Sequence, residues 1–290
     1  MVKWPELSIF QDSGFWEEAW MKARQDSLYA RSLVGRDGTE YWNRRATSFA
    51  LHARSSEAQH RIAKVLHILG HIASLPSEAE VLDIGCGPGR YALALARRVK
   101  KVVALDPSPD MLSMLQSGME EEGIDNIEPV QMGWEEVDLD ELGWRHRFHV
   151  VLALMSPGIR DVPTLKKMID ASRQVCLLAS HVRQEDAARY DLWEKLIGGK
   201  KPPLPEDPLY IFALLYSWGY FPSLDLERRV SRRELPVSEA IEELENFFYP
   251  YLELTPAVRQ AIRDYVNSRA REGLYLQERE LVTAYLYWSV

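Results

Sequence analysis

Cysteine is scarce in this chain: Cys86 and Cys176 are the only two among 290 residues. Two cysteines cannot form a disulfide framework, and they cannot complete a zinc site by themselves. Their scarcity is typical of proteins kept in a reducing compartment. We therefore predict a cytoplasmic protein.

Long apolar runs are also missing. The longest, Ile211 to Phe221, is too short to cross a bilayer. The first twenty residues contain no uninterrupted apolar stretch of the length that a signal peptide needs. We expect no membrane partner.

Positive charge is not in excess, because 35 Lys and Arg residues face 43 Asp and Glu residues, a net charge of −8. Such a chain repels a phosphate backbone unless its basic residues are segregated, so we expect no nucleic-acid partner. The only dense basic run contains Arg228, Arg229, Arg232 and Arg233. It can neutralise an anionic substrate, but the solvated face of an edge strand is the favoured interpretation.

Histidines recur on one helical stripe at His60, His67 and His71. A zinc or nickel site is one interpretation of this spacing. However, Lys64 stands within the stripe and no carboxylate or thiolate is suitably spaced, so a solvated helix face is favoured. We predict no metal site.

The composition, 46% hydrophobic and 27% charged residues, is that of a soluble globular protein. Apolar residues at helical spacing predict helices from Ser13 to about Leu33 and within Tyr41 to His71. The pattern then changes to short apolar runs that alternate with helical segments, which indicates an α/β core with a parallel, doubly wound sheet. The predicted strands are Glu80–Ile84, Lys101–Asp106, Ile127–Met132, His149–Met155 and Gln174–His181. The predicted helices are Arg90–Arg98, Pro109–Glu122, an acidic tract near Glu135–Leu142, and Val162–Arg173.

Beyond Val182 the regular alternation stops. A proline-rich connection precedes an aromatic helix, Leu209–Gly219. The aromatic residues of this region are interpreted as core packing first and pocket lining second. Two further strands, Ser223–Leu235 and Glu280–Val290, are predicted to flank two helices, Val237–Tyr251 and Thr255–Arg271.

A glycine loop lies in the stretch VLDIGCGPGRYALALARR, which begins at Val81. A buried strand runs into glycines at positions 85, 87 and 89 and then directly into a helix, so main-chain N–H groups face a ligand at the carboxyl edge of the sheet. A dinucleotide fingerprint would need a glycine where Arg90 stands. Asp106 ends the next strand 21 positions after Gly85, near the spacing of a ribose-binding carboxylate. The predicted ligand therefore contains a ribose.

These segments, VLDIGCGPG and VVALDPSPDML, resemble the cofactor motifs of class I S-adenosylmethionine (SAM)-dependent methyltransferases of the small-molecule types 11 and 25. The resemblance covers roughly Tyr41 to His181. It implies a Rossmann-like, doubly wound, seven-stranded mixed sheet whose last strand is antiparallel. It also implies an N-terminal helical cap (1–75), a SAM-binding α/β core (76–182) and a C-terminal part (183–290) that completes the sheet and carries a helical lid at about 237–271.

The resemblance also implies residue roles. Asp83 orients the loop and the methionyl amino group, Asp106 binds the ribose, and Met111 flanks the adenine. The loop after the third strand has Gly133 where the family often has an acid, which leaves the adenine amino group to main chain or to Glu135. The cofactor-binding residues predicted in this way are Tyr41, Asp83, Gly85, Cys86, Gly87, Gly89, Asp106, Pro107, Met111, Gly133, Trp134, Glu135 and Met155.

The predicted function is transfer of a methyl group from SAM to a small-molecule acceptor by direct in-line displacement, which leaves S-adenosylhomocysteine (SAH). His181, at the carboxyl end of the fifth strand, is the predicted general base. Two alternatives stay open: a SAM- or nucleotide-binding protein without activity, and an NAD-dependent oxidoreductase. The sequence does not specify the acceptor or the oligomeric state.

Overall fold

A computed structural model describes residues 7–27, 42–43, 55–73, 75–202, 204 and 207–290. Its centre is a seven-stranded sheet in the order β3-β2-β1-β4-β5-β7-β6. The strands are β1 (Glu80–Ile84), β2 (Lys101–Asp106), β3 (Ile127–Gln131), β4 (Phe148–Leu154), β5 (Ser172–Asp186), β6 (Ser223–Pro236) and β7 (Leu274–Ser289). β7 is antiparallel to both of its neighbours, and the pairs among β1 to β5 are parallel. The predicted doubly wound, seven-stranded mixed sheet is confirmed.

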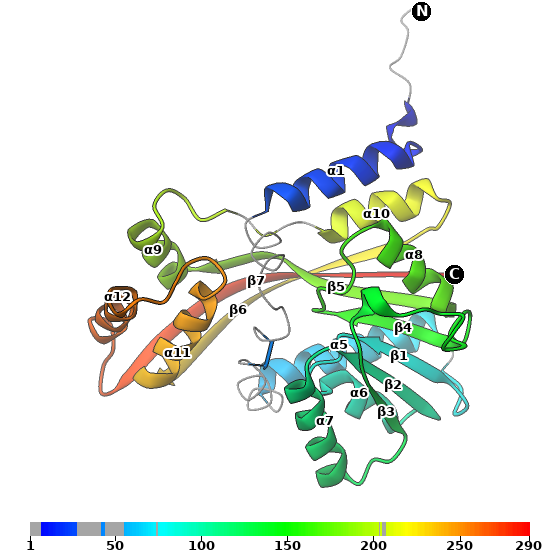
Figure 1. Ribbon diagram of the computed structural model, residues 1–290, viewed down its shortest axis with the longest axis horizontal. Coiled ribbons are helices and arrows are strands. Elements are labelled where there is room, and N and C mark those ends of the chain that lie inside the picture. Colours follow the sequence, from blue (N-terminus) through cyan, green and yellow to red (C-terminus); the bar gives the residue numbers. More distant parts are fainter. Residues whose placement is uncertain (1–6, 28–41, 44–54, 74, 203, 205–206) are drawn as a thin grey trace, which may run out of the picture.

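Helices cover both faces of this sheet (Figure 1). Within β1, Val81 contributes to a core shared with α5, α6 and α7, and the next residue, Leu82, contributes to a core shared with α8 and α10. Burial on both faces explains why the central strands are almost continuously apolar. The helices are α1 (Ser13–Asp26), α5 (Ser56–Ile72), α6 (Arg90–Ala96), α7 (Pro109–Glu122), α8 (Val162–Ala171), α9 (Ala187–Leu196), α10 (Asp207–Ser217), α11 (Val237–Phe248) and α12 (Pro256–Asn267), with short 3-10 turns at Leu7–Phe10 and Trp134–Glu136.

The N-terminal helix α1 packs on α10. The indole Nε1 of Trp20 donates a hydrogen bond to Asp207, and Arg24 pairs with the same carboxylate at 2.6 Å. Trp20 is fully buried in the core on this face. The helix predicted from Ser13 thus ends at Asp26, and residues 28–41, which include the end of the predicted segment, lie outside the described residues.

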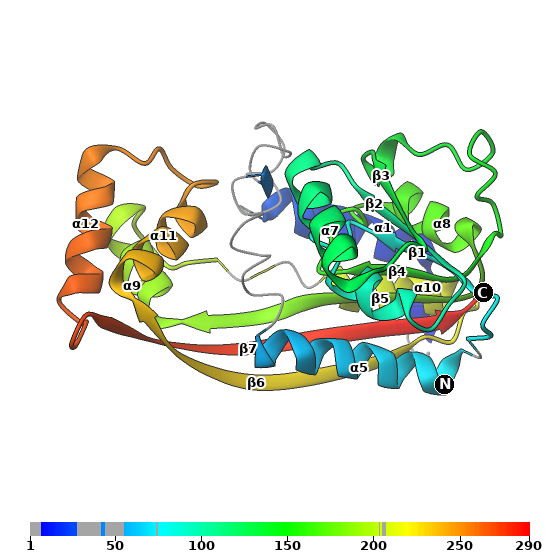
Figure 2. The same ribbon diagram turned by 90° about the horizontal axis from the view of Figure 1, so that it is seen from below.

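Three strands run well past the rest of the sheet. β5, β6 and β7 are 15, 14 and 16 residues long, whereas β1 has five. Their distal halves, with α9, α11 and α12, form an extension that we call the arm (Figure 2). It has its own apolar cluster around Trp193, Phe248 and Ile262. The predicted strands Gln174–His181 and Glu280–Val290 are therefore correct in place but too short.

The basic run on β6 divides between the two faces of the strand, because successive strand residues point in opposite directions. Arg228 and Arg232 lie on the exposed face and pair with Glu280 and Glu278 of β7. Arg229 lies on the opposite face, in a pocket between β6 and α5. The interpretation of the run as the solvated face of an edge strand therefore holds for Arg228 and Arg232.

One predicted helix is wrong. The acidic tract near Glu135–Leu142 forms only the turn Trp134–Glu136 and then an irregular loop. The carboxylate of Asp138 accepts hydrogen bonds from the main-chain N–H groups of Asp140 and Glu141. This local bonding competes with helix formation, as is common for aspartate.

Candidate functional site

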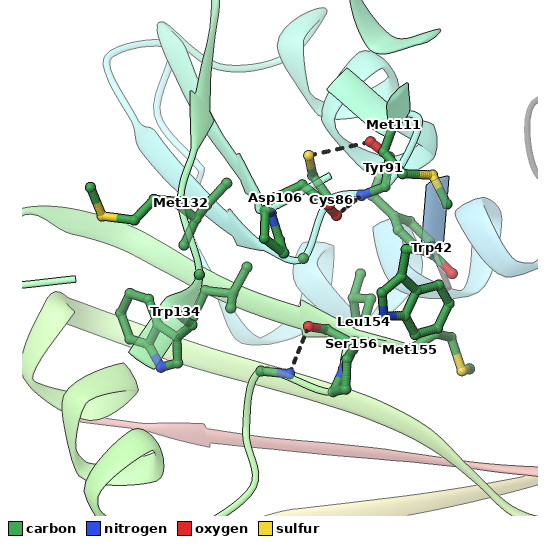
Figure 3. A pocket seen from close by; sticks show the side chains of 18 of the residues that line it. Trp42, Cys86, Tyr91, Asp106, Met111, Met132, Trp134, Leu154, Met155 and Ser156 are labelled. Atoms are coloured by element: carbon green, nitrogen blue, oxygen red, sulfur yellow. Dashed lines mark hydrogen bonds between the residues drawn. The ribbon is translucent and has the colours of Figure 1, made fainter. Parts of the chain in front are cut away.

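A cavity of about 410 Å³ opens at the carboxyl ends of β1, β2 and β4. Figure 3 shows Asp106 and Cys86 near its middle, Trp134 and Met132 on one side, and Trp42 and Met155 on the other. Ten of the thirteen predicted cofactor-binding residues line it: Gly85, Cys86, Gly87, Asp106, Pro107, Met111, Gly133, Trp134, Glu135 and Met155.

The glycine loop is held by main-chain bonds to the neighbouring strand. The N–H groups of Gly85 and Cys86 both donate to the carbonyl oxygen of Leu105, at 2.7 and 3.0 Å. Gly85 has φ +68°, and a Cβ at this position would lie 2.2 Å from Oγ of Ser156. Glycine is required here because both the conformation and the close approach of the loop after β4 exclude a side chain.

Asp106 closes β2 beside this loop and is 7% exposed. Its Oδ2 accepts from Gly87 N–H at 2.8 Å, and its Oδ1 accepts from Ser108 N–H at 2.9 Å. Burial raises the pKa of Asp106, although the two N–H donors oppose the shift. Each carboxylate oxygen accepts more than one hydrogen bond, so both retain capacity toward the hydroxyl groups of a ligand.

Asp83 lies deeper, is 1% exposed and does not line the cavity. Burial and the nearby Asp106 carboxylate raise the pKa of Asp83 to about 7. Its Oδ2 has no hydrogen-bond partner among the described residues. A buried acceptor without a partner calls for a donor from water or a ligand.

The loop after β3 closes one end of the cavity. The indole of Trp134 is 2% exposed and donates from Nε1 to the carbonyl oxygen of Thr164. Lys167 of α8 donates from Nζ to three main-chain carbonyl oxygens of this loop, those of Trp134, Glu135 and Val137, at 3.0, 3.0 and 2.7 Å. The loop is therefore fixed from α8, and the far edge of the Trp134 ring is anchored in the core.

Met155 follows β4 in the left-handed region, with φ +57°. Such a backbone is uncommon for a methionine and costs about 1–3 kcal/mol. Its N–H donates to Ala179 at 2.8 Å, which ties the residue to β5. Strained residues of this kind concentrate at binding sites, and Met155 lines the cavity as predicted.

A sequence model described as "Methyltransferase domain" matches residues 81–177, from β1 into β5. These residues are a class I SAM-dependent methyltransferase domain. The prediction of a methyltransferase domain with SAM as its cofactor is thereby confirmed for these residues. The residues present fit that cofactor: Asp106 has acceptor capacity at the cavity, and Asp83 has an unpartnered oxygen.

Relatives by sequence match stretches of very different length. A tRNA/tmRNA (uracil-C(5))-methyltransferase of Actinobacillus pleuropneumoniae is 35% identical over 60 residues, 21% of this chain but only 16% of the relative. A longer match, 23% identical over 218 residues, covers 75% of this chain and 78% of an uncharacterized protein of Haemophilus influenzae.

Two solved structures share this fold over more than three quarters of the chain. A candidate type II methyltransferase from Anaeromyxobacter dehalogenans has a TM-score of 0.52 at 15% identity, over 77% of this chain and 94% of the other. A candidate methyltransferase from Bacillus halodurans has a TM-score of 0.50 at 20% identity, over 79% and 97%.

Three predicted site residues do not line the cavity of the methyltransferase domain. Gly89, the last residue of the glycine loop, is the N-cap of α6, with φ +81°. His181 hydrogen-bonds through Nδ1 to Oγ1 of Thr283 at 3.0 Å, on the side of the sheet covered by α5. Burial, together with the charge of Arg61, lowers the pKa of His181 to about 4, so its imidazole is neutral at pH 7. Asp83 is the third, and Tyr41 lies outside the described residues.

Sequence reasoning missed several residues that line the cavity: Arg24, Trp42, Arg61, Arg90, Tyr91 and Arg160. Arg90 directly follows the glycine loop, so its position was a usable signal. Arg24 and Arg61 come from α1 and α5, far from the loop in sequence, and only the fold brings them to it. Among the described residues no group of three metal-binding side chains occurs, and no helix there is long and apolar enough to span a bilayer.

Proposed function

We propose that this protein transfers the methyl group of SAM to a small-molecule acceptor. The observation that carries the proposal is the pairing of the Gly85–Gly89 loop with the Asp106 carboxylate on the wall of one cavity. The bound cofactor supplies an activated methyl group on a sulfonium, and displacement leaves the neutral thioether SAH.

The residues of the chain would align the reactants. Asp106 would accept hydrogen bonds from the ribose hydroxyls, and Asp83 would face the ammonium of the methionine part. Met111, Gly133, Trp134 and Glu135 would surround the adenine. This assignment would place the methyl group beside Met155, so that a nucleophile approaches in line with the departing sulfur. His181 stays a candidate base.

A small acceptor is favoured over RNA, although RNA is the substrate named for the Actinobacillus relative. The net charge of −8 opposes binding of a polyanion, and the cavity has the volume of a small-molecule site. The role of residues 237–271 as a lid stays a prediction. The helices α11 and α12 of this segment lie on the arm, and none of their residues lines the cavity. The free, buried Cys86 and Cys176 suit a cytoplasmic location.

The test begins with binding. Calorimetry on the full chain should show saturable binding of SAH and none of NAD; the reverse result would identify an oxidoreductase. The protein is then incubated with SAM labelled in its methyl group and a pool of small metabolites. Appearance of label in an acceptor, together with SAH, supports catalysis. Tight SAH binding without transfer to any pool would instead support a binding protein without activity.

A further inference from the structure

A second cavity, of about 210 Å³, lies between the N-terminal part of α5 and the strands β6 and β7. We call it the polar pocket. The charged and hydroxyl residues that line it include Ser56, Glu57, Arg61, Glu227, Arg229 and Thr283. Ser231 and Arg232 line it as well, and the guanidinium of Arg232 is paired with Glu278. At about 30 Å³ per water molecule, it has room for a carboxylate or phosphate group with a few attached carbon atoms.

Arg61 connects the polar pocket to the cofactor cavity, because it lines both. Its guanidinium pairs with Glu57 one helical turn away, and its side chain is only 16% exposed. A molecule seated in the polar pocket would therefore lie next to the cofactor cavity.

The charges of the polar pocket are incompletely matched. Glu57 pairs with Arg61, and Glu227 accepts a bond from His60 at 2.7 Å. Arg229 makes no hydrogen bond or ion pair with any other described residue, and its Nη1 is a buried donor without a partner. A guanidinium in this position gains most from an oxyanion, which it binds through two parallel N–H groups.

Other buried donors nearby also lack partners. They are Nε of Arg90, next to the glycine loop, and the hydroxyl of Tyr285 on β7. Both side chains interact electrostatically with Arg61. Burial opposes the ionisation of Glu57, yet Arg61, His181 and Arg229 together hold its pKa below the usual range. The neighbourhood of Arg61 thus carries more positive than negative charge.

We infer that the polar pocket binds an oxyanion group, a carboxylate or a phosphate, of the methyl acceptor through Arg229 and Arg61. Only the identity of the ligand as a methyl acceptor rests on the proposed function, because oxyanion binding can be measured without SAM. The inference also places a bound acceptor near His181, the candidate base, because its hydrogen-bond partner Thr283 lines the polar pocket. An acidic acceptor held here would lie beside Arg61, which also lines the cofactor cavity, and beside Thr283, the partner of His181.

The test uses inorganic phosphate and succinate as probes, titrated calorimetrically into the full chain without SAM. Wild type should bind at least one probe saturably, and the tighter of the two identifies the kind of oxyanion. R229Q should weaken that binding at least tenfold. The matched control is R228Q, the neighbouring arginine, which is 70% exposed on the opposite face and pairs with Glu280. It should change the affinity less than twofold.

A second measurement needs no variant. Phosphate or succinate should slow the modification of Arg229 by phenylglyoxal relative to that of Arg228, as followed by peptide mass spectrometry. The inference is overturned if neither probe binds saturably, if R228Q and R229Q lose affinity equally, or if Arg229 is not protected.

SAH binding, measured in parallel, separates the two proposals. R229Q should retain wild-type SAH affinity, which also shows that the variant is folded. Absence of probe binding in wild type, with SAH still bound, refutes the polar pocket alone. Absence of SAH binding in wild type refutes the proposed methyl transfer while leaving the oxyanion result to stand by itself.

Discussion

Oδ2 of Asp106 accepts a hydrogen bond from the main-chain N–H of Gly87 at 2.8 Å, so the carboxylate that closes β2 also fixes the glycine loop that follows β1. Substitution of Asp106 should therefore also disturb the conformation of the glycine loop, and a change in the loop should shift the carboxylate.

Asp106→Ala should weaken SAH binding by roughly 10- to 150-fold, or about 1.5–3 kcal/mol, because charge-assisted bonds to ribose hydroxyls are lost. Calorimetry measures the change. Asp110→Asn, at an exposed position in the first turn of α7, is the control and should bind SAH like wild type. Unchanged affinity in the Asp106 variant would refute the ribose assignment.

Gly89→Ala should destabilise the fold. Gly89 has φ +81°, and a Cβ there would lie 2.2 Å from Cδ1 of the buried Leu115. The left-handed backbone costs about 1–2 kcal/mol and overpacking about 1–3 kcal/mol more, so a total loss of about 2–5 kcal/mol is expected in urea unfolding.

Gly123→Ala provides the comparison for this loss. Gly123 has φ +62° at the end of α7, but a Cβ there would meet no atom within 4 Å. Only the backbone cost of about 1–2 kcal/mol applies. Equal losses in the two variants would show that the contact with Leu115 relaxes without cost.

Lys167→Met should loosen the loop after β3, because three main-chain carbonyl oxygens lose a charged donor. We expect a loss of about 1.5–3 kcal/mol in unfolding free energy and a weaker affinity for SAH. Lys166→Met, its exposed neighbour, removes only a cation–π contact with Trp218, so it should change stability far less and leave the SAH affinity at the wild-type value. If SAH affinity stays at the wild-type value while stability falls, the loop does not contribute to the cofactor site.

Asp83 should make the stability of the unliganded protein depend on pH. Its pKa is raised to about 7 in the folded state, above the value of about 3.9 expected in the unfolded chain. Between these two pKa values the folded state binds a proton that the unfolded state does not. The contribution of Asp83 to the free energy of unfolding is therefore fully present below pH 4 and is lost as the pH rises toward 7. Urea unfolding of wild type and Asp83→Asn at pH 4 to 8 isolates it. The stability of wild type relative to the variant should fall over this range; a constant difference would contradict the shifted pKa.

The sequence alone determined the core of the site. The strand, the glycine loop, the following helix and Asp106 lie within 27 consecutive residues, 80 to 106, so local conformational rules and one spacing sufficed to predict them. All seven strands and most of the helices followed from hydrophobic periodicity in the same way, whereas α9 was not predicted. The irregular loop after Trp134, where a helix was predicted, was harder to predict from the sequence. Its conformation depends on hydrogen bonds that the Asp138 carboxylate accepts from the main chain.

The tertiary structure decided what surrounds that core. Arg61 and Arg24 reach the cavity from α5 and α1, which pack on elements distant in the sequence, and no spacing in the sequence encodes such contacts. The length of the arm was hidden for a related reason. Gln277 and Arg279 are polar, and they are stabilised in β7 by strand pairing and by the carboxylates of Glu243 and Asp186, which lie far away in the sequence. The cofactor motif is local in the chain, whereas the polar pocket exists only because α5, β6 and β7 meet in space.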